Sequence, residues 1–221
     1  MPESKNAQFN PTGPHASRSG ASGSGRAERT MVFLGDSLTE DGHWSEWFPD
    51  ANVHNLGRGG DTTDGVLARL GEVVAAAPDE ILLLIGTNDL ATRQTVEHLV
   101  RNIQSIMVDL RRDLPGARML LQSILPRARE LADQIQTANI HLRQFAATVR
   151  AQYLDLWPAM ALEDGELNPV FSDDRLHLSA AGYDAWLGEL RPALERLRDE
   201  PPMSRPIQAI HLDEDTNPTY F

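Results

Sequence analysis

Three residues in two distant segments have the side-chain types that nucleophilic acyl transfer requires. Ser37 lies within residues 35–40 (GDSLTE), and a serine hydroxyl becomes a good nucleophile once a base removes its proton. His177 is the residue type suited to that task near neutral pH, and Asp174 could orient its ring through one nitrogen. Asp173 is the obvious rival for this carboxylate. Taken singly, each residue is more often structural, as a turn serine, a helix cap or a packed histidine.

Two further segments could supply hydrogen-bond donors for the oxyanion of a tetrahedral intermediate. Such an oxyanion requires N–H groups held in fixed positions. Residues 55–63 (NLGRGGDTT) contain Gly60, and glycines let backbone N–H groups approach a ligand closely. Residues 86–89 (GTND) contain Asn88, which offers a side-chain amide. Because separate segments together fill every role, function explains the set better than chance.

The elements that position these residues alternate between strands and helices. Strands are predicted at residues 31–34, 52–56, 80–85, 118–124 and 152–156, and the apolar run is clearest in the third of these. Helical periodicity predicts helices at 62–77, 95–114, 130–150 and 179–198, the last capped by Ser179. Strands that are apolar throughout indicate a parallel sheet covered on both faces. We therefore expect one three-layer α/β/α domain of flavodoxin-like type, with five parallel strands in the order 2-1-3-4-5 and ligands at their carboxyl ends.

The composition argues against several classes of function. The 221-residue chain has 41% hydrophobic and 24% charged residues, a balance typical of a soluble globular protein. Its formal net charge of -12 disfavours nucleic acid and anionic membrane surfaces as partners. No cysteine is present, the seven histidines form no H-x-x-x-H pair, and no phosphate loop occurs. Thr62 occupies the last glycine position of a dinucleotide fingerprint that begins at Gly57. We expect no metal and no cofactor.

The sequence resembles the SGNH (GDSL-type) hydrolases in four blocks that occur in the family's order. These are GDSLTE at 35–40, the glycine within NLGRGGDTT, GTND at 86–89, and the D-x-x-H of residues 174–177. The resemblance covers roughly residues 31–197. The chain is most similar to the subgroup that includes the platelet-activating-factor acetylhydrolase catalytic subunits. That subgroup shares the GGD-Thr/Ser form, the L-P-R of residues 125–127 and the L-H-L-S around the histidine.

The resemblance implies a role for each matched residue. Ser37 would be the nucleophile, His177 the general base and then the general acid, and Asp174 its orienting partner, which the family spacing favours over the preceding aspartate. The N–H groups of Ser37 and Gly60 and the Asn88 amide would form the oxyanion hole. Two further aspartates, Asp36 and Asp89, would hold loops in place.

Neighbours of these residues could form the substrate pocket. Three of them could wall an apolar acyl pocket, with packing against the sheet as an equal alternative: Leu38, Thr87 and Leu176. Three others could border the alcohol side, although for the tryptophans packing is at least as good an explanation: Trp44, Trp47 and Arg127.

The expected function is a serine esterase that hydrolyses short-chain, acetyl-type carboxylic esters through an acyl-enzyme. An acyltransferase that passes the acyl group to a sugar or alcohol is one alternative, and a non-catalytic binding or scaffold protein is another. The expected partner is a small ester, either an acetylated sugar or a lipid-like ester. By analogy with the subgroup, a homodimer is also expected.

The chain divides into three expected parts. Residues 1–29 are expected to be a disordered segment, because residues 17–25 read SRSGASGSG and no apolar signal stretch occurs. Residues 30–199 would form the SGNH hydrolase domain, and residues 200–221 a C-terminal tail. No apolar window reaches the length needed to span a bilayer, so we expect no stable membrane insertion and a cytoplasmic location.

Overall fold

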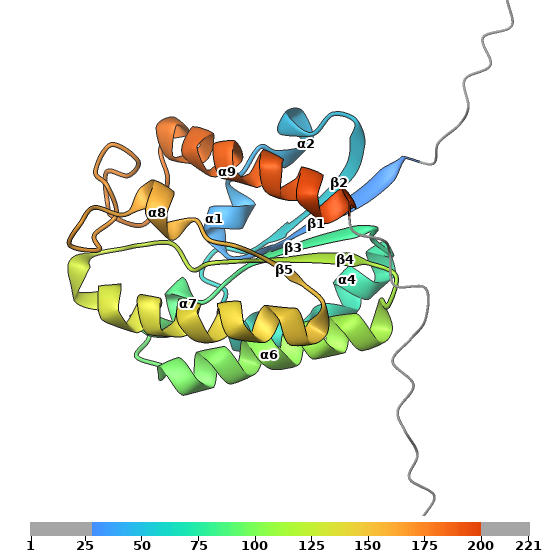
Figure 1. The fold of residues 1–221 in the computed structure, drawn as a ribbon, viewed down its shortest axis with the longest axis horizontal. Coiled ribbons are helices and arrows are strands. Elements are labelled where there is room, and N and C mark those ends of the chain that lie inside the picture. The colour runs from blue at the N-terminus through green and yellow to red at the C-terminus, as the bar shows by residue number, and fades with distance from the viewer. Residues whose placement is uncertain (1–27, 200–221) are drawn as a thin grey trace, which may run out of the picture.

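Residues 28–199, described by a computed structural model, form three layers around one parallel sheet (Figure 1). The strands are β1 (Arg29–Gly35), β2 (Ala51–Gly57), β3 (Glu80–Leu84), β4 (Arg118–Gln122) and β5 (Gln152–Leu154). All pairs are parallel, and the order is β2-β1-β3-β4-β5. The predicted fold class and strand order are therefore confirmed. The expectations for residues 1–29 and 200–221 lie outside the described residues, apart from residues 28 and 29.

Helices cover both faces of the sheet, as Figure 1 shows. One face carries α1 (Ser37–Glu40), α2 (Trp44–Trp47), α8 (Trp157–Met160) and α9 (Ala180–Asp199). The other carries α3 (Thr63–Ala68), α4 (Leu70–Ala76), α5 (Thr87–Ala91), α6 (Val96–Asp113) and α7 (Ala132–Ala146). Short 3-10 turns at Arg129–Leu131 and Ala147–Val149 flank α7. Among residues 28–199, no helix has the length and apolar character that crossing a membrane requires.

The buried strands divide their side chains between two hydrophobic clusters. In β1, Met31 and Phe33 belong to the cluster under α9, whereas Val32 and Leu34 belong to the cluster under α6 and α7. This division follows from the two-residue repeat of a strand, which points successive side chains to opposite faces. Continuous apolar runs therefore have a partner layer on each side, which is why the sequence predicted these strands well.

Some predicted helices differ from those observed. The helix predicted at residues 62–77 is two helices, because Arg69 leaves the helical range at φ -120° and ψ 18°. The helix predicted at 130–150 is shorter and ends before Arg150, which has a positive φ of 51°. Ile140, an apolar residue of this helix, is 57% exposed. Ser179 is confirmed as a cap, since its Oγ accepts from the Gly182 N–H at 3.3 Å.

Candidate active site

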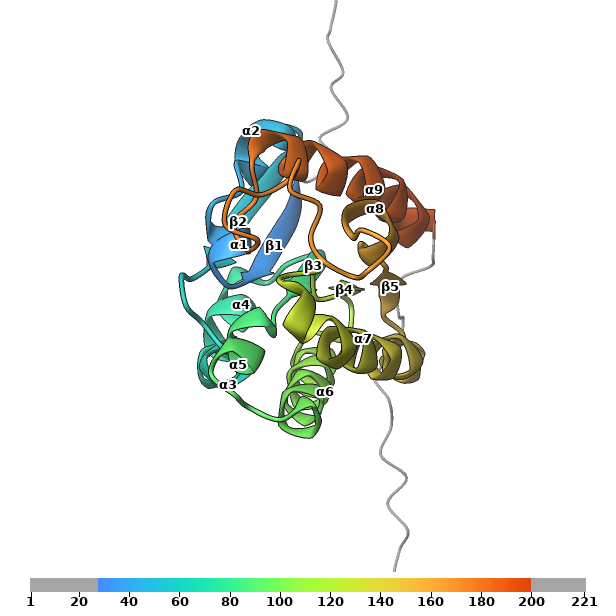
Figure 2. The same cartoon turned by 90° about the vertical axis from the view of Figure 1, so that its left-hand side faces the viewer.

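The four matched blocks meet at the carboxyl ends of the strands. Three neighbouring strands, β2, β1 and β3, each lead into one block, and the fourth block lies in the loop before α9. Figure 2 looks onto this end of the sheet, where the orange loop before α9 passes beside α1. Neighbouring parallel strands thus deliver residues that are distant in sequence to a single edge.

A tight turn from β1 into α1 presents Ser37. Ser37 is half-buried and is the first residue of α1, so its N–H has no partner within the helix. The Asp36 side chain caps this helix by accepting from the Leu38 N–H at 3.0 Å. Gly35 fits because a Cβ there would lie 2.3 Å from the Leu84 carbonyl oxygen. A larger residue at this position would collide with β3 and with Thr39 of α1.

A relay of three side chains joins Ser37 to the loop before α9. Ser37 Oγ lies 3.4 Å from His177 Nε2, and His177 Nδ1 lies 2.7 Å from Asp174 Oδ2. The first contact is long, as is common without substrate, and such bonds tighten in the reacting complex. The bond to His177, followed by backbone N–H bonds, holds the pKa of Asp174 well below its usual range. The carboxylate is therefore ionised at neutral pH and can stabilise a protonated imidazole.

Local backbone geometry aims Asp174 at the histidine. Its Oδ1 accepts from the N–H groups of Leu176 at 2.9 Å and His177 at 2.8 Å. Arg175 adopts a positive φ of 63°, and its Nε pairs with Glu166 Oε1 at 2.6 Å. This tight turn brings the aspartate back onto the ring three residues later. The neighbouring Asp173 is exposed and has no hydrogen bond or ion pair with residues 28–199. The structure therefore joins Asp174, not Asp173, to the histidine.

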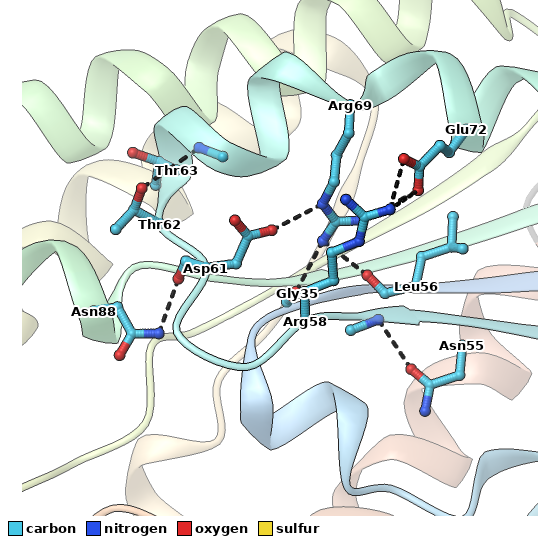
Figure 3. A network of polar contacts seen from close by, with 12 residues as sticks. Gly35, Asn55, Leu56, Arg58, Asp61, Thr62, Thr63, Arg69, Glu72 and Asn88 are labelled. Carbon is cyan, nitrogen blue, oxygen red and sulfur yellow. Dashed lines mark hydrogen bonds and ion pairs between the residues drawn. The ribbon is translucent and has the colours of Figure 1, made fainter.

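The two candidate oxyanion donors lie on adjoining loops. Gly60 is exposed, has a positive φ of 75°, and a Cβ there would meet no atom within 4 Å. Its requirement for glycine is therefore conformational rather than steric. Asn88 Nδ2 donates to the Asp61 carbonyl oxygen at 2.9 Å, as Figure 3 shows. An amide nitrogen carries two hydrogens, so this bond fixes the Asn88 side chain and leaves one N–H for a substrate.

Asp89 ties the two donor loops together. It is fully buried and accepts from the Thr63 N–H at 3.0 Å and from the Thr63 hydroxyl. Asn102 on α6 donates to the same hydroxyl at 3.0 Å. Burial raises the pKa of Asp89, and the Thr63 bonds oppose that rise. These contacts agree with the expectation that Asp89 holds loops in place.

Asp36 is a buried carboxyl beside the candidate nucleophile. It is 0% exposed, and its Oδ2 has no hydrogen-bond partner among residues 28–199. Burial raises its pKa to about 7, and the negative charges of Asp61 and Asp89 add to that rise. Between about pH 4 and pH 7 the folded chain thus keeps a proton that the unfolded chain releases. Its contribution to stability accordingly falls as the pH rises through this window.

We expect Asp36→Asn to stabilise the protein relative to wild type at pH 8 but far less at pH 5. Asparagine can still accept from the Leu38 N–H, and it cannot ionise. The stabilisation of the variant relative to wild type, as unfolding free energy, should be larger at pH 8 than at pH 5 by about 2 to 4 kcal/mol. Urea denaturation at both pH values measures it. If the difference in unfolding free energy between Asp36→Asn and wild type is the same at both pH values, the raised pKa is contradicted.

The proposed acyl-pocket residues differ in how they are placed. Leu38 is 1% exposed within the cluster under α9, and its carbonyl accepts from the Tyr183 hydroxyl at 2.8 Å. Thr87 is 1% exposed, whereas Leu176 is half-buried. The packing alternative therefore describes Leu38 well, and Leu176 is the most accessible of the three.

The residues assigned to the alcohol side are only partly near the site. Trp44 is 1% exposed and stacks on Phe33 with ring centroids 4.2 Å apart, so it cannot line an open pocket. That suggestion was wrong, because the aromatic cluster under α9 buries its ring. Trp47 packs edge-on against Trp44 at 5.1 Å. Arg127 is half-buried and donates to the Thr87 carbonyl at 3.1 Å, next to Asn88.

Arg69 is a buried arginine that contacts the first two blocks, and it was not singled out from the sequence. It lies within the helix predicted at 62–77, and a charged side chain on such a helix usually faces water. Instead its side chain is 6% exposed and binds residues of both blocks. A useful signal was its position one turn after the glycine loop, at a site where a helix would otherwise place an apolar side chain.

Residues 33–185 match the sequence profile of the GDSL-like lipase/acylhydrolase family. The chain belongs to this family. It is 33% identical over 180 residues to platelet-activating factor acetylhydrolase IB subunit alpha1 of Rattus norvegicus, covering 77% of each chain. The match and its relatives identify it as a carboxylic ester hydrolase of the SGNH/GDSL class.

Solved structures share its fold. A GDSL-like lipase from Bacteroides thetaiotaomicron superposes with a TM-score of 0.65 at 25% identity, over 76% of this chain and 88% of that one. A candidate acylhydrolase from Bacteroides fragilis gives a TM-score of 0.71 at 23% identity, over 77% of this chain and 88% of that one. At 23% identity, the similarity to the Bacteroides fragilis structure shows the fold alone.

Proposed function

We propose that the protein is a serine esterase that hydrolyses short-chain carboxylic esters, acetyl esters foremost, through an acyl-enzyme on Ser37. One observation carries the proposal: the continuous relay from Ser37 Oγ through the His177 ring to the Asp174 carboxylate. A hydroxyl, an imidazole and an ionised acid in this order form the arrangement that activates a serine.

The geometry supports a two-step reaction. His177 Nε2 accepts the Ser37 proton as Oγ attacks the ester carbonyl, and a tetrahedral intermediate forms. The N–H groups of Ser37 and Gly60, with the free N–H of Asn88, stabilise its oxyanion. His177 then donates the proton to the departing alcohol, leaving an acyl-Ser37. Water, activated by the same ring, cleaves the acyl group and restores the enzyme.

Two observations support a small acyl group. Leu38 and Thr87 are 1% exposed, so the protein is close-packed next to Ser37 and Asn88 and leaves little room there for a long acyl chain. The rat relative is named an acetylhydrolase, which points to the same acyl group. On the alcohol side the half-buried Arg127 suits a polar leaving group, either an acetylated sugar or the headgroup region of a lipid-like ester.

Exposure of the catalytic base favours hydrolysis over acyl transfer. The side chains of His177 and Asp174 are 48% and 55% exposed, so water reaches the relay readily. An acyltransferase uses the same acyl-enzyme but must deliver its acceptor faster than water arrives. A solvent-exposed site does not keep water away from the acyl-enzyme, so it favours hydrolysis.

The test compares p-nitrophenyl acetate, butyrate and octanoate, with and without an added alcohol acceptor. We expect kcat/KM to be at least about tenfold higher for acetate than for octanoate, because extra methylenes must fit against close-packed walls. The acetyl group should appear mainly as free acetate even with acceptor present. Ser37→Ala serves as the blank. Preference for octanoate would reject the small pocket, and acetylated acceptor as the main product would establish the transferase.

A further inference from the structure

Arg69 joins α3 to α4, and its guanidinium points into the protein toward the ends of two strands. Its Nη2 donates to the carbonyl oxygens of Gly35 at 3.1 Å and Leu56 at 2.9 Å, and its Nε donates to Asp61 Oδ2 at 2.8 Å (Figure 3). Nη1 makes no hydrogen bond among residues 28–199 and lies 3.9 Å from Glu72 Oε2. A planar guanidinium with three fixed partners holds them in one geometry.

The partners of Arg69 belong to the segments that carry the reaction. Gly35 ends β1 two residues before Ser37, and Leu56 lies near the end of β2. Asp61 directly follows Gly60, the backbone donor. One buried side chain therefore links the strand that presents the nucleophile to the loop that presents an oxyanion donor.

Asp61 passes this link on to Asn88. Its carboxylate is held by Arg69, and its backbone carbonyl accepts the amide of Asn88 at 2.9 Å. This is the one hydrogen bond of the Asn88 side chain within residues 28–199. An asparagine amide otherwise rotates about its side-chain bonds, so the direction of its second N–H depends on where the Asp61 carbonyl lies.

From these contacts we propose that Arg69 is a positioning residue for the oxyanion hole, acting through Asp61 on the amide of Asn88. The proposal rests on the proposed function, since it assumes that Asn88 donates to the oxyanion. A donor displaced from the place where charge develops stabilises the transition state less, while the binding of the ground-state ester is little affected.

Arg69→Lys tests the proposal with little change in charge. Lysine keeps one positive group but lacks the fork that reaches Asp61 and two carbonyls together. With p-nitrophenyl acetate, kcat should fall about 10- to 50-fold, with KM within about threefold of wild type. In an Asn88→Ala background, the same substitution should lower kcat by less than about threefold, because the donor that it positions is already absent.

Two further variants provide an independent test at Asp61 and a matched control at Arg58. Asp61→Asn retains the carbonyl that holds Asn88 but weakens the bond to Arg69, and it should lower kcat in the same way even if Arg69→Lys folds poorly. Arg58→Lys is the matched control: Arg58 is exposed, pairs with Glu72 at 2.7 Å in the same cluster, and its side chain has no bond to Asp61 (Figure 3). Its kcat should stay within about twofold of wild type, as for most exposed ion pairs.

The outcomes separate positioning from mere stability. Equal losses of kcat with and without Asn88, or a rise in KM with kcat unchanged, would overturn the proposal. In ¹⁵N-labelled protein, the Asn88 side-chain amide signal, assigned by its loss in Asn88→Ala, should shift in Arg69→Lys and not in Arg58→Lys. An unmoved signal would also overturn it. Because this readout needs no turnover, it tests Arg69 even if the wild type shows no Ser37-dependent hydrolysis, a result that would instead reject the proposed function.

Discussion

Ser37→Ala and His177→Ala should each lower kcat for p-nitrophenyl acetate by on the order of 10⁵- to 10⁶-fold, because serine and base act as one unit. Alanine at 37 removes the oxygen that forms the acyl-enzyme. Alanine at 177 removes the ring nitrogen that lies 3.4 Å from that oxygen. Steady-state hydrolysis at neutral pH, corrected for the spontaneous rate, measures both losses.

The double variant Ser37→Ala/His177→Ala shows whether the two residues act in one step or contribute independently to kcat. It should be little slower than either single variant, since each already abolishes nucleophilic attack. Ser45→Ala and His141→Ala are matched controls, because both side chains are exposed, on α2 and α7, and neither belongs to the relay. They should keep wild-type turnover. Losses that multiply in the double variant would mean that the two residues act independently.

Asp174→Ala should lower kcat by on the order of 10⁴-fold, whereas Asp173→Ala should leave it within about threefold of wild type. The two residues are neighbours of identical chemistry, yet only Asp174 contacts the ring, at 2.7 Å from Nδ1. Its loss also frees the His177 N–H and leaves the Leu176 N–H with Ser172 Oγ as its remaining acceptor. The same esterase assay, with thermal unfolding to compare stability, measures both variants.

Asp174→Asn separates orientation from charge. Asparagine can still accept the two backbone N–H bonds through Oδ1, but its NH₂ group would face His177 Nδ1 and favour the wrong tautomer. Its loss of kcat should therefore approach that of Asp174→Ala while its stability stays closer to wild type. If Asp173→Ala proves the more damaging change, the assignment of the acid is wrong.

The strands could be predicted from the sequence because their apolar residues are also the residues that the sheet buries. Residues 81–85 are apolar without interruption, and only a strand covered on both faces buries such a run completely. The pairing of Asp174 with His177 was accessible for a similar reason, since three residues of chain hold the two together. By contrast, Ser37 and His177 are 140 residues apart, and their meeting was inferred from the ordered family blocks rather than from local pattern.

Other features depend on tertiary contacts that a single sequence does not display. Arg69 interrupts the predicted helix, and its guanidinium binds two buried carbonyl oxygens that helical periodicity does not reveal. Trp44 is enclosed by an aromatic cluster whose members come from distant segments, including Trp186 on α9. Ile140 stays exposed because Ile135 and Leu142 already face the core from α7. The short helices α1, α2, α5 and α8 have four or five residues, too few for a period to show.

Peptide mass spectrometry after treatment with diethyl p-nitrophenyl phosphate would show which side chain is the nucleophile. The reagent phosphorylates an activated serine and releases p-nitrophenol. We expect one phosphoryl group per chain, on the peptide that contains Ser37, with loss of esterase activity in the same proportion and no labelling in His177→Ala. Full inactivation with the label on another residue, or esterase activity that survives complete labelling of Ser37, would show that this serine does not carry the acyl group.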